Sequence, residues 1–377
     1  MSRILIALTS VLATVLIASP ASAAEEAPRA SASFNGEVLQ VAYAGDRVFA
    51  AGEFTHGLDT DGVYRRRDHL AAVSAATGRL LPFRADIDGT VHEVAATGDH
   101  LYIGGQFRRI DGHYLPKAAR FDLATGEVDT GWRPRPSGAV FAIEPAGDTV
   151  YLGGRFGQVA GEPSPRLAAV SADSGAPVEA FTPSVEDGAI RDLASDGDRL
   201  YAVGAFRSVD GDSSLRHFAA VDRETGRADG SFRPGLTALA YQLTVHEGSL
   251  YLAVDGRGGS LVSYSTSGRL KWSVAADGGL QAVAVDGDTV VAGGHFDRVC
   301  RMKAPAVGEC YAGKVRRGKL FAVDLSGGLR DWNPHADSAV GVHALAAAPG
   351  ASGFAAGGAF LTFGDGAVPQ RAFALFD

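Results

Sequence analysis

The loop at residues 55–67 carries side chains that can bind a ligand. Asp59 and Asp61 lie in an Asp-x-Asp-Gly sequence, and Tyr64 follows two residues after the glycine. Carboxylate oxygens at this spacing begin many calcium-binding loops, but the glutamate that completes such a loop is missing here. We therefore expect no cofactor, keep calcium at this loop as the alternative, and assign the three side chains to ligand binding.

Two other loops contain residue types that bind sugars. One holds Asp111, His113 and Tyr114, and the other holds Asp210 and Asp212. Such side chains bind sugars by hydrogen bonding and by stacking of aromatic rings. We expect them to contribute to a carbohydrate site, with a purely structural role in the loops as the alternative.

A third loop, residues 297–319, is the longest insertion in the chain and is basic. Its charged residues include Arg301, Lys303, Arg316 and Arg317. On an otherwise acidic protein, this patch can contact an acidic polymer or partner. An ordinary solvated loop is the alternative.

Cys300 and Cys310 are the two cysteines of the chain, and both lie in this basic loop. An exported protein meets oxidising conditions, so we expect a disulfide between them. Closing a loop of this length contributes about 2–3 kcal/mol in the chain-entropy estimate. A zinc site is disfavoured because two cysteines without suitably spaced histidines do not supply four ligands.

Evidence for catalysis is sparse in this sequence. His92, His246 and His343 fall in or near the first strand of a repeated unit, where they can point toward a central axis. No nucleophile motif or metal-protease motif accompanies them. The catalytic residues are therefore unknown, and an enzyme whose carboxylates assemble from several repeats remains the alternative.

One repeated unit positions all of these residues. Its clearest copy runs through Val150-Tyr151-Leu152-Gly153-Gly154-Arg155-Phe156, and its Gly-x-Phe element recurs every 49 to 53 residues at first. The element ends at Phe54, Phe107, Phe156, Phe206, Phe296 and Phe360. Each unit has four short apolar runs separated by glycine-containing turns, the pattern of a four-stranded antiparallel blade.

The two ends of the repeat region complement each other. The last copy stops after its third apolar run at Phe376, and residues 31–36 resemble the missing fourth run. Six complete copies and one shared copy predict an all-β, seven-bladed β-propeller of four-stranded antiparallel blades. We expect an N-terminal strand to complete the C-terminal blade, so that residues 31–377 form one domain.

Paired glycines recur inside the second strand of the unit, as at Gly153 and Gly154. Glycine weakens a strand and therefore needs a structural reason there. We expect close approach of neighbouring blades to be that reason. A phosphate-binding role is disfavoured because no helix follows these glycines.

The N-terminus and the charge indicate compartment and partners. Residues 1–23 have the pattern of a secretory signal peptide, and residues 24–30 are expected to be a flexible mature N-terminus. We therefore expect a secreted, extracellular protein. With 35 basic and 43 acidic residues, the net charge of −8 disfavours nucleic acid and membrane as partners.

The repeat resembles the delta-sixty or kelch-like propeller repeats of secreted actinobacterial proteins, a family whose function is largely uncharacterised. The resemblance lies in Leu-Tyr-x-Gly-Gly-x-Phe, Leu-Ala-Ala-Val and the final Phe/Trp-x-Pro elements, and implies fold and export. Compartment, size and architecture are also similar to the propeller lectin subunits of streptomycete umbrella toxin particles, which implies target recognition and membership of a larger secreted complex.

Together, these observations predict a secreted, non-catalytic recognition or scaffold protein. We expect it to bind a carbohydrate, or a secreted or cell-surface protein, through loops on one face of the propeller. The alternative is an extracellular enzyme that acts on a polysaccharide or glycan through carboxylates at the mouth of the axial channel.

Overall fold

A computed structural model describes residues 27–377 except 257, 339 and 351. The expected signal peptide and part of the flexible segment at 24–30 lie outside the described residues. The described chain is all-β, and its one helical element is the short 3₁₀ helix η1 (Ser213–Leu215). In this part of the chain, no helix has the length and hydrophobicity that a membrane crossing requires.

Within the described residues, the long strands form seven antiparallel sheets, each starting from one inner strand. In chain order, the first four sheets are β2 (Val38–Ala44), β3 (Arg47–Gly52) and β6 (Leu70–Ser74); β7 (Val91–Ala96), β8 (His100–Gly105) and β11 (Ala118–Asp122); β12 (Ala139–Ala146), β13 (Thr149–Arg155) and β16 (Leu167–Ser171); and β18 (Ile190–Asp196), β19 (Arg199–Gly204) and β21 (Phe218–Asp222). The remaining three are β22 (Ala240–His246), β23 (Ser249–Val254), β24 (Ser260–Ser265) and β25 (Leu270–Ala275); β26 (Leu280–Asp286), β27 (Thr289–Gly294) and β30 (Leu320–Asp324); and β31 (Val342–Ala347), β32 (Phe354–Gly358) and β35 (Phe373–Phe376).

Short strands outside these sheets pair in the loops between the second and third long strands or next to them. They are β1 (Ser33–Phe34), β4 (His56–Leu58) and β5 (Tyr64–Arg66); β9 (Arg109–Ile110) and β10 (His113–Tyr114); β14 (Gln158–Val159) and β15 (Glu162–Pro163); β17 (Val185–Glu186) and β20 (Ser208–Val209); β28 (Arg298–Cys300) and β29 (Lys314–Arg316); and β33 (Thr362–Phe363) and β34 (Val368–Pro369).

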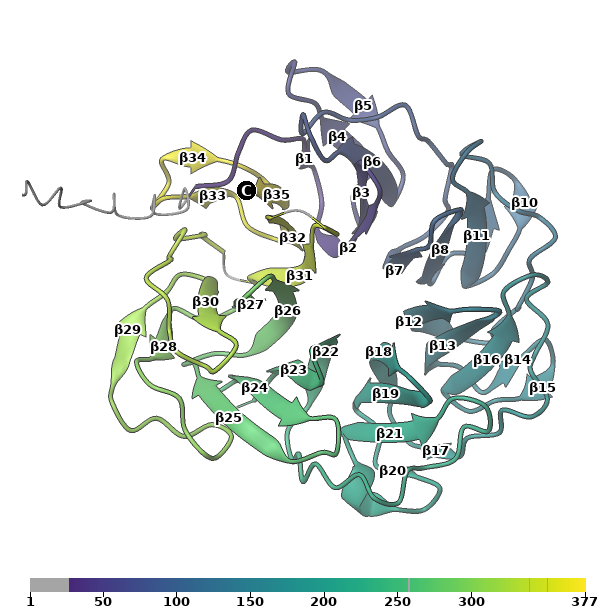
Figure 1. The fold of residues 1–377 in the computed structure, drawn as a ribbon. Coiled ribbons are helices and arrows are strands. Elements are labelled where there is room, and N and C mark those ends of the chain that lie inside the picture. Colours follow the sequence, from purple (N-terminus) through teal and green to yellow (C-terminus); the bar gives the residue numbers. More distant parts are fainter. Residues whose placement is uncertain (1–26, 257, 339, 351) are drawn as a thin grey trace, which may run out of the picture.

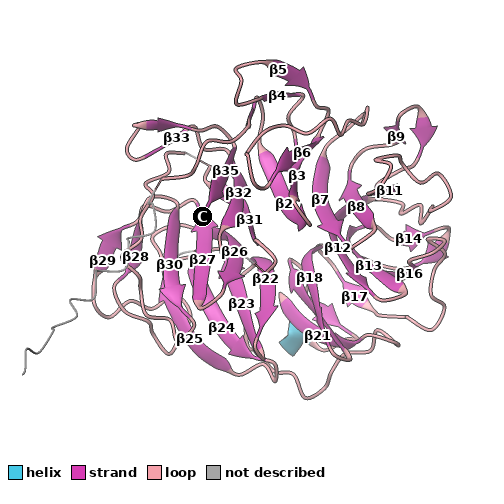
Figure 2. Ribbon diagram, turned by 45° about the horizontal axis from the view of Figure 1, so that its top comes forward, coloured by secondary structure: helices cyan, strands magenta, loops and turns pink. Residues whose placement is uncertain are grey.

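The first strands of the seven sheets, here called the inner strands, surround a common centre (Figure 1). Each inner strand packs against the next one in chain order, from β2 through β7, β12, β18, β22 and β26 to β31, and β31 packs against β2. The outer strands and hairpins lie farther from this centre (Figures 1 and 2). The hydrophobic core lies between neighbouring sheets, where apolar side chains of one face meet those of the next.

The two ends of the described chain lie together. The backbone N–H of Arg29 donates to the carbonyl of Leu375 at 2.9 Å, and the ring centroids of Phe34 and Phe373 are 5.9 Å apart. The side-chain amide of Gln370 also donates to the carbonyl of Ala32 at 3.0 Å. The N-terminal segment therefore lies beside the last strand. The prediction that it supplies the fourth strand of the C-terminal blade was wrong, because Ser33–Phe34 pairs with β4 and, among the described residues, only Arg29 bridges to Leu375.

The expectation of four-stranded blades was wrong for six of the seven sheets in the described chain, which have three strands. In those sheets, the fourth apolar run makes at most an isolated bridge, such as Val221 with Ala228. Proline contributes in four of these sheets, because Pro134, Pro183, Pro234 and Pro334 lack the N–H that a ladder needs. The copies that contain Phe34 and Phe83 have no proline at this position, so proline does not account for them. The fifth copy has no proline in residues 270–275, and it forms the full strand β25.

Close approach of neighbouring sheets explains the first glycine of each pair, as expected. A Cβ added at Gly153 would lie 2.5 Å from Cγ2 of Ile190, on the inner strand of the next sheet. Cβ atoms do not come this close to other carbon atoms. Glycine at this position therefore lets the sheets converge on the central axis.

Candidate functional site

A cavity of about 180 Å³ lies on the axis that the inner strands surround. Its walls come from the second and third residues of these strands, so that every one of the seven sheets contributes. We call it the axial cavity. It is lined by Leu39, Gln40, His92, Glu93, Phe141, Arg191, Asp192, Tyr241, Gln242, Gln281 and His343.

A β-bulge in each inner strand makes this lining possible. In β18, Ile190 pairs with Gly204 and Asp192 pairs with Val203, so that Arg191 has no partner of its own. Consecutive side chains of a regular strand point to opposite faces, whereas a bulge redirects one of them. Arg191 and Asp192 therefore both reach the cavity. The register shifts at the equivalent place in the other six inner strands.

Polar side chains after the bulge accept hydrogen bonds from backbone N–H groups near it. Asp192 accepts from Leu193 N–H at 2.8 Å through Oδ1 and from Leu243 N–H at 2.8 Å through Oδ2. Glu93 accepts from Val94 N–H at 3.1 Å and from the amide of Gln40 at 3.0 Å. Since Leu243 belongs to the next inner strand, Asp192 connects two neighbouring sheets.

The carboxyl groups of Glu93 and Asp192 prefer to be protonated. Burial raises the pKa of Asp192 to about 7, and the charge of Glu144 adds to this effect. Burial also raises the pKa of Glu93 well above its ordinary value, and the charge of Asp192 raises it further. A carboxyl group in a site of low polarity is neutral at a pH where an exposed one is ionised.

Half of the cavity wall is aromatic and basic. The guanidinium Cζ of Arg191 lies 4.8 Å from the ring centroid of Phe141 and 5.8 Å from that of Tyr241. The ring of His92 meets Phe141 edge-on, with centroids 5.1 Å apart. Burial and the charge of Arg191 lower the pKa of His92 to about 4, so its imidazole is neutral at pH 7.

The opposite half of the wall holds a histidine with polar neighbours from the chain itself. Nδ1 of His343 lies 3.0 Å from Oε1 of Gln281, and its Nε2 lies 3.3 Å from a carboxylate oxygen of Glu37. Of the three histidines that the sequence placed near an axis, His92 and His343 line the cavity. His246 lies at the other end of its strand and faces Glu247 at 3.9 Å.

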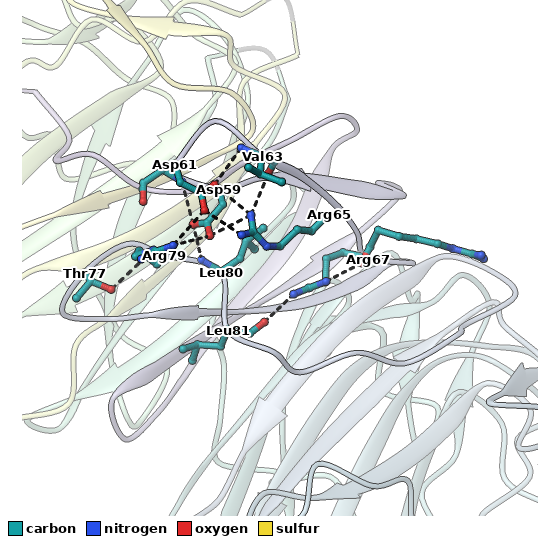
Figure 3. A network of polar contacts seen from close by, with 11 residues as sticks. Asp59, Asp61, Val63, Arg65, Arg67, Thr77, Arg79, Leu80 and Leu81 are labelled. Carbon is teal, nitrogen blue, oxygen red and sulfur yellow. Dashed lines mark hydrogen bonds and ion pairs between the residues drawn. The ribbon is translucent and has the colours of Figure 1, made fainter.

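The loop with Asp59 and Asp61 lies at the outer rim, where both carboxylates face arginines (Figure 3). Asp59 is buried, and its Oδ2 lies 3.3 Å from Arg65 and 3.5 Å from Arg79. Its Oδ1 accepts from Leu80 N–H at 3.0 Å. Among the described residues, no group of three or more His, Cys, Asp or Glu side chains is arranged to hold a metal ion.

Replacing Asp59 by alanine is expected to lower the free energy of unfolding by about 1–3 kcal/mol, because the buried N–H of Leu80 loses its acceptor. Urea denaturation measures this loss. Asp61→Ala is the matched control, since Asp61 binds the same two arginines but is partly exposed. A loss for Asp61→Ala as large as that for Asp59→Ala would contradict the assignment.

The other predicted loop residues are also at the periphery, in the outer hairpins and turns. Asp111 accepts from Asp86 N–H at 2.8 Å, Asp210 accepts from Ala228 N–H at 2.8 Å, and Asp212 caps η1 through Ser214 N–H at 2.9 Å. These carboxylates therefore stabilise their own loops. The side chains of Tyr64, His113 and Tyr114 are exposed.

Most of the basic side chains predicted in this loop are engaged by contacts within the chain. Arg316 pairs with Asp365 at 2.7 Å, Arg317 donates to the carbonyl of Arg330 at 3.1 Å, and Lys303 donates to the carbonyl of Ser326 at 2.6 Å. Arg301 is exposed. The expected disulfide between Cys300 and Cys310 is present, with Cα atoms 5.6 Å apart.

The structure therefore does not gather the predicted loop residues into one site, and the axial cavity was missed apart from two histidines. A usable signal was present in the sequence. The residue that follows the first buried apolar residue of each inner strand differs in type from copy to copy, while the apolar residue before it repeats. These residues are Leu39, His92, Phe141, Arg191, Tyr241, Gln281 and His343.

No protein-family model matches this chain, and neither does any curated protein. Among solved structures, it is similar to the computationally designed Ika8 protein, at 14% sequence identity and a TM-score of 0.49. That match covers 91% of this chain and 98% of the designed one.

Proposed function

We propose that this chain is a secreted, seven-bladed β-propeller that recognises a carbohydrate in its axial cavity without acting on it chemically. The cyclic packing of the inner strands and the contact of the N-terminal segment with β35 support the closed ring. The Cys300–Cys310 disulfide supports an oxidising compartment. Membership of the secreted delta-sixty or kelch-like propellers, and a role within a larger secreted complex, belong to the same proposal.

The observation that carries the proposal is the composition of the cavity wall. Sugars are bound by hydrogen-bonding groups and by aromatic faces that pack on the apolar side of the ring. Phe141 and Tyr241 supply the aromatic faces, while Gln242 and Gln281, whose oxygens already contact Val283 N–H and His343, supply amide N–H groups. Tyr241 and Gln242 share β22, the other two come from other sheets, and all four line the same cavity.

The volume of the cavity limits what can enter. At about 180 Å³ it is smaller than the pockets of roughly 300–1,000 Å³ that hold drug-sized ligands. We therefore propose that a single terminal sugar ring enters the cavity, while the rest of the glycan or its carrier protein stays outside.

A glycan array probed with the purified protein tests this function, followed by titration of the best glycan. Phe141→Ala and Tyr241→Ala are expected to weaken binding about tenfold each, because each removes one aromatic contact. Tyr114→Ala is the matched control, since Tyr114 is 59% exposed on an outer hairpin. Loss of binding only in Tyr114→Ala would move the site to the rim loops, and no bound glycan at all would overturn the proposal.

The paired carboxyl groups of Glu93 and Asp192 favour one alternative, a glycan-hydrolysing enzyme. Two carboxyl groups with different environments can serve as acid and base. Here, however, their oxygens already accept hydrogen bonds from backbone N–H groups and from Gln40. We therefore propose a structural role for them. Release of reducing ends from a glycan that binds, abolished in Asp192→Asn, would instead establish the enzyme.

A further inference from the structure

Arg191 is a partly buried cation without a counter-ion in the described part of the chain. Burial lowers its pKa, and the charges that act on it come from Tyr241 and Arg155 rather than from a carboxylate. Its Nε is buried and has no hydrogen-bond partner among the described residues. An unpaired buried charge is costly, and a ligand anion would offset that cost.

The adjacent carboxyl group does not neutralise it. Both oxygens of Asp192 are directed to backbone N–H groups, those of Leu193 and Leu243. The two buried arginines do have partners: Arg120 pairs with Asp129, and Arg67 donates to the carbonyls of Arg66 and Leu81. The difference indicates that the position of Arg191 is not explained by contacts within the chain.

The surroundings of Arg191 hold it in one orientation toward the cavity. Phe141 and Tyr241 contact the guanidinium with their rings, from the strands before and after its own. Cation–π contacts stabilise the charge but leave the N–H groups free to donate. His92 lies on β7, the inner strand before that of Phe141. Its Nε2 is also buried and has no hydrogen-bond partner among the described residues.

We propose that the sugar bound in the axial cavity is a hexuronate, whose carboxylate is held by the guanidinium of Arg191. This inference rests on the proposed function and names its ligand class. A planar guanidinium donates two parallel hydrogen bonds to a carboxylate, and His92 can add a third from its neutral imidazole. A neutral hexose leaves Arg191 unpaired and therefore binds more weakly.

Other acidic groups face the same space and set a pH limit. Glu93 and Asp192 are neutral while protonated, and they do not repel a carboxylate in that form. Glu37 lies on the opposite side, where it pairs with His343. Ionisation of Asp192 is expected to weaken hexuronate binding as the pH rises through about 7.

Calorimetric titration of the purified protein at pH 6 tests the proposal. The probes are the methyl glycosides of glucuronic, galacturonic and mannuronic acid, each paired with its neutral hexoside, and sodium acetate. We expect at least one uronide to bind ten- to a hundredfold more tightly than its neutral partner. Acetate, which lacks the ring, is expected to bind at least tenfold more weakly than that uronide.

Variants assign the effect to one side chain. Arg191→Met is expected to abolish the preference for the uronide, and it should fold because it removes an uncompensated charge rather than a paired one. Arg191→Lys keeps the charge without the planar fork and is expected to retain only part of the preference. Arg207→Met is the matched control, because the side chain of Arg207 is 79% exposed and pairs with Asp187. It should bind like the unmodified protein.

The outcomes separate this inference from the function on which it rests. Equal affinities for all uronides and their neutral hexosides would overturn the hexuronate while leaving carbohydrate recognition intact. If acetate binds as tightly as the best uronide, Arg191 is an anion-binding residue, but the proposal that the ligand is a sugar is overturned. Absence of binding by every probe, with the Nε–Hε NMR signal of Arg191 unchanged, would overturn both.

Discussion

Gly154→Ala is expected to lower the free energy of unfolding by roughly 3 kcal/mol or more. A Cβ at this position would lie 2.2 Å from the carbonyl oxygen of Ala139 and 3.0 Å from the Cα of Val140. Both atoms belong to the backbone of the neighbouring inner strand, which cannot move aside without disturbing its bulge. The substitution therefore strains the sheet where it approaches the axis.

Urea unfolding followed by tryptophan fluorescence measures this loss. Gly157→Ala is the matched control, because a Cβ there meets no heavy atom within 4 Å. We expect Gly157→Ala to stay within about 0.5 kcal/mol of the unmodified protein. Equal stability of the two variants would show that the pairing of β13 with the bulged strand β12 does not depend on glycine at position 154.

The unmodified protein and Asp192→Asn are expected to differ in their free energies of unfolding, and this difference should change by roughly 3–5 kcal/mol between pH 4 and pH 8. The pKa of Asp192 is raised in the folded state from 3.8 to about 7, so the folded state binds the proton more tightly than the unfolded state. Its contribution is therefore fully present below about pH 4 and is lost as the pH rises through 7. Asparagine does not titrate and does not lose this contribution.

Asp192→Asn should accordingly be the less stable protein at pH 4, by about 1–3 kcal/mol. Asparagine has one side-chain oxygen, whereas Asp192 accepts from two N–H groups. The gap should close or reverse by pH 8. His92, whose pKa is lowered to about 4, imposes the opposite slope on both proteins, so it cancels in the difference.

Urea unfolding at unit steps of pH measures both profiles. Asp196→Asn is the control on the same strand, because Asp196 is exposed and its environment changes little on unfolding. Its profile should run parallel to that of the unmodified protein. If the profile of Asp192→Asn also runs parallel, the carboxyl group of Asp192 in the unmodified protein is ionised in the folded state.

The sequence contained a sign of the missing fourth strands that the repeat pattern obscured. The aromatic-x-Pro element marks the same place in most copies, and the hydrophobic alternation around it predicts a strand. Pro183 and Pro234 remove N–H groups that would pair there, whereas Trp272 lies in a copy without proline and in a complete strand. The copies with Phe34 and Phe83 also lack the fourth strand without a proline at this position, so proline accounts for only part of the difference.

The predicted site residues lie apart in the structure, and ligand binding by them stays a prediction. Asp59, Asp111 and Asp210 are the kind of residue that binds ligands, but they are also the kind that stabilises turns. Which of the two roles applies depends on whether a backbone N–H is within reach, and each of these carboxylates has one. The amino-acid composition of a loop does not show whether such an N–H group is within reach.

The sequence alone predicted the all-β class, the disulfide and the close approach at the paired glycines. Each of these features depends on residues that are near in sequence or repeated at a fixed interval. The axial cavity depends on one or two residues from each of seven strands that extend from Leu39 to His343. Only the packing of those strands around one centre, with a bulge in each, brings Arg191 beside Phe141 and Tyr241 and away from any counter-ion in the described chain.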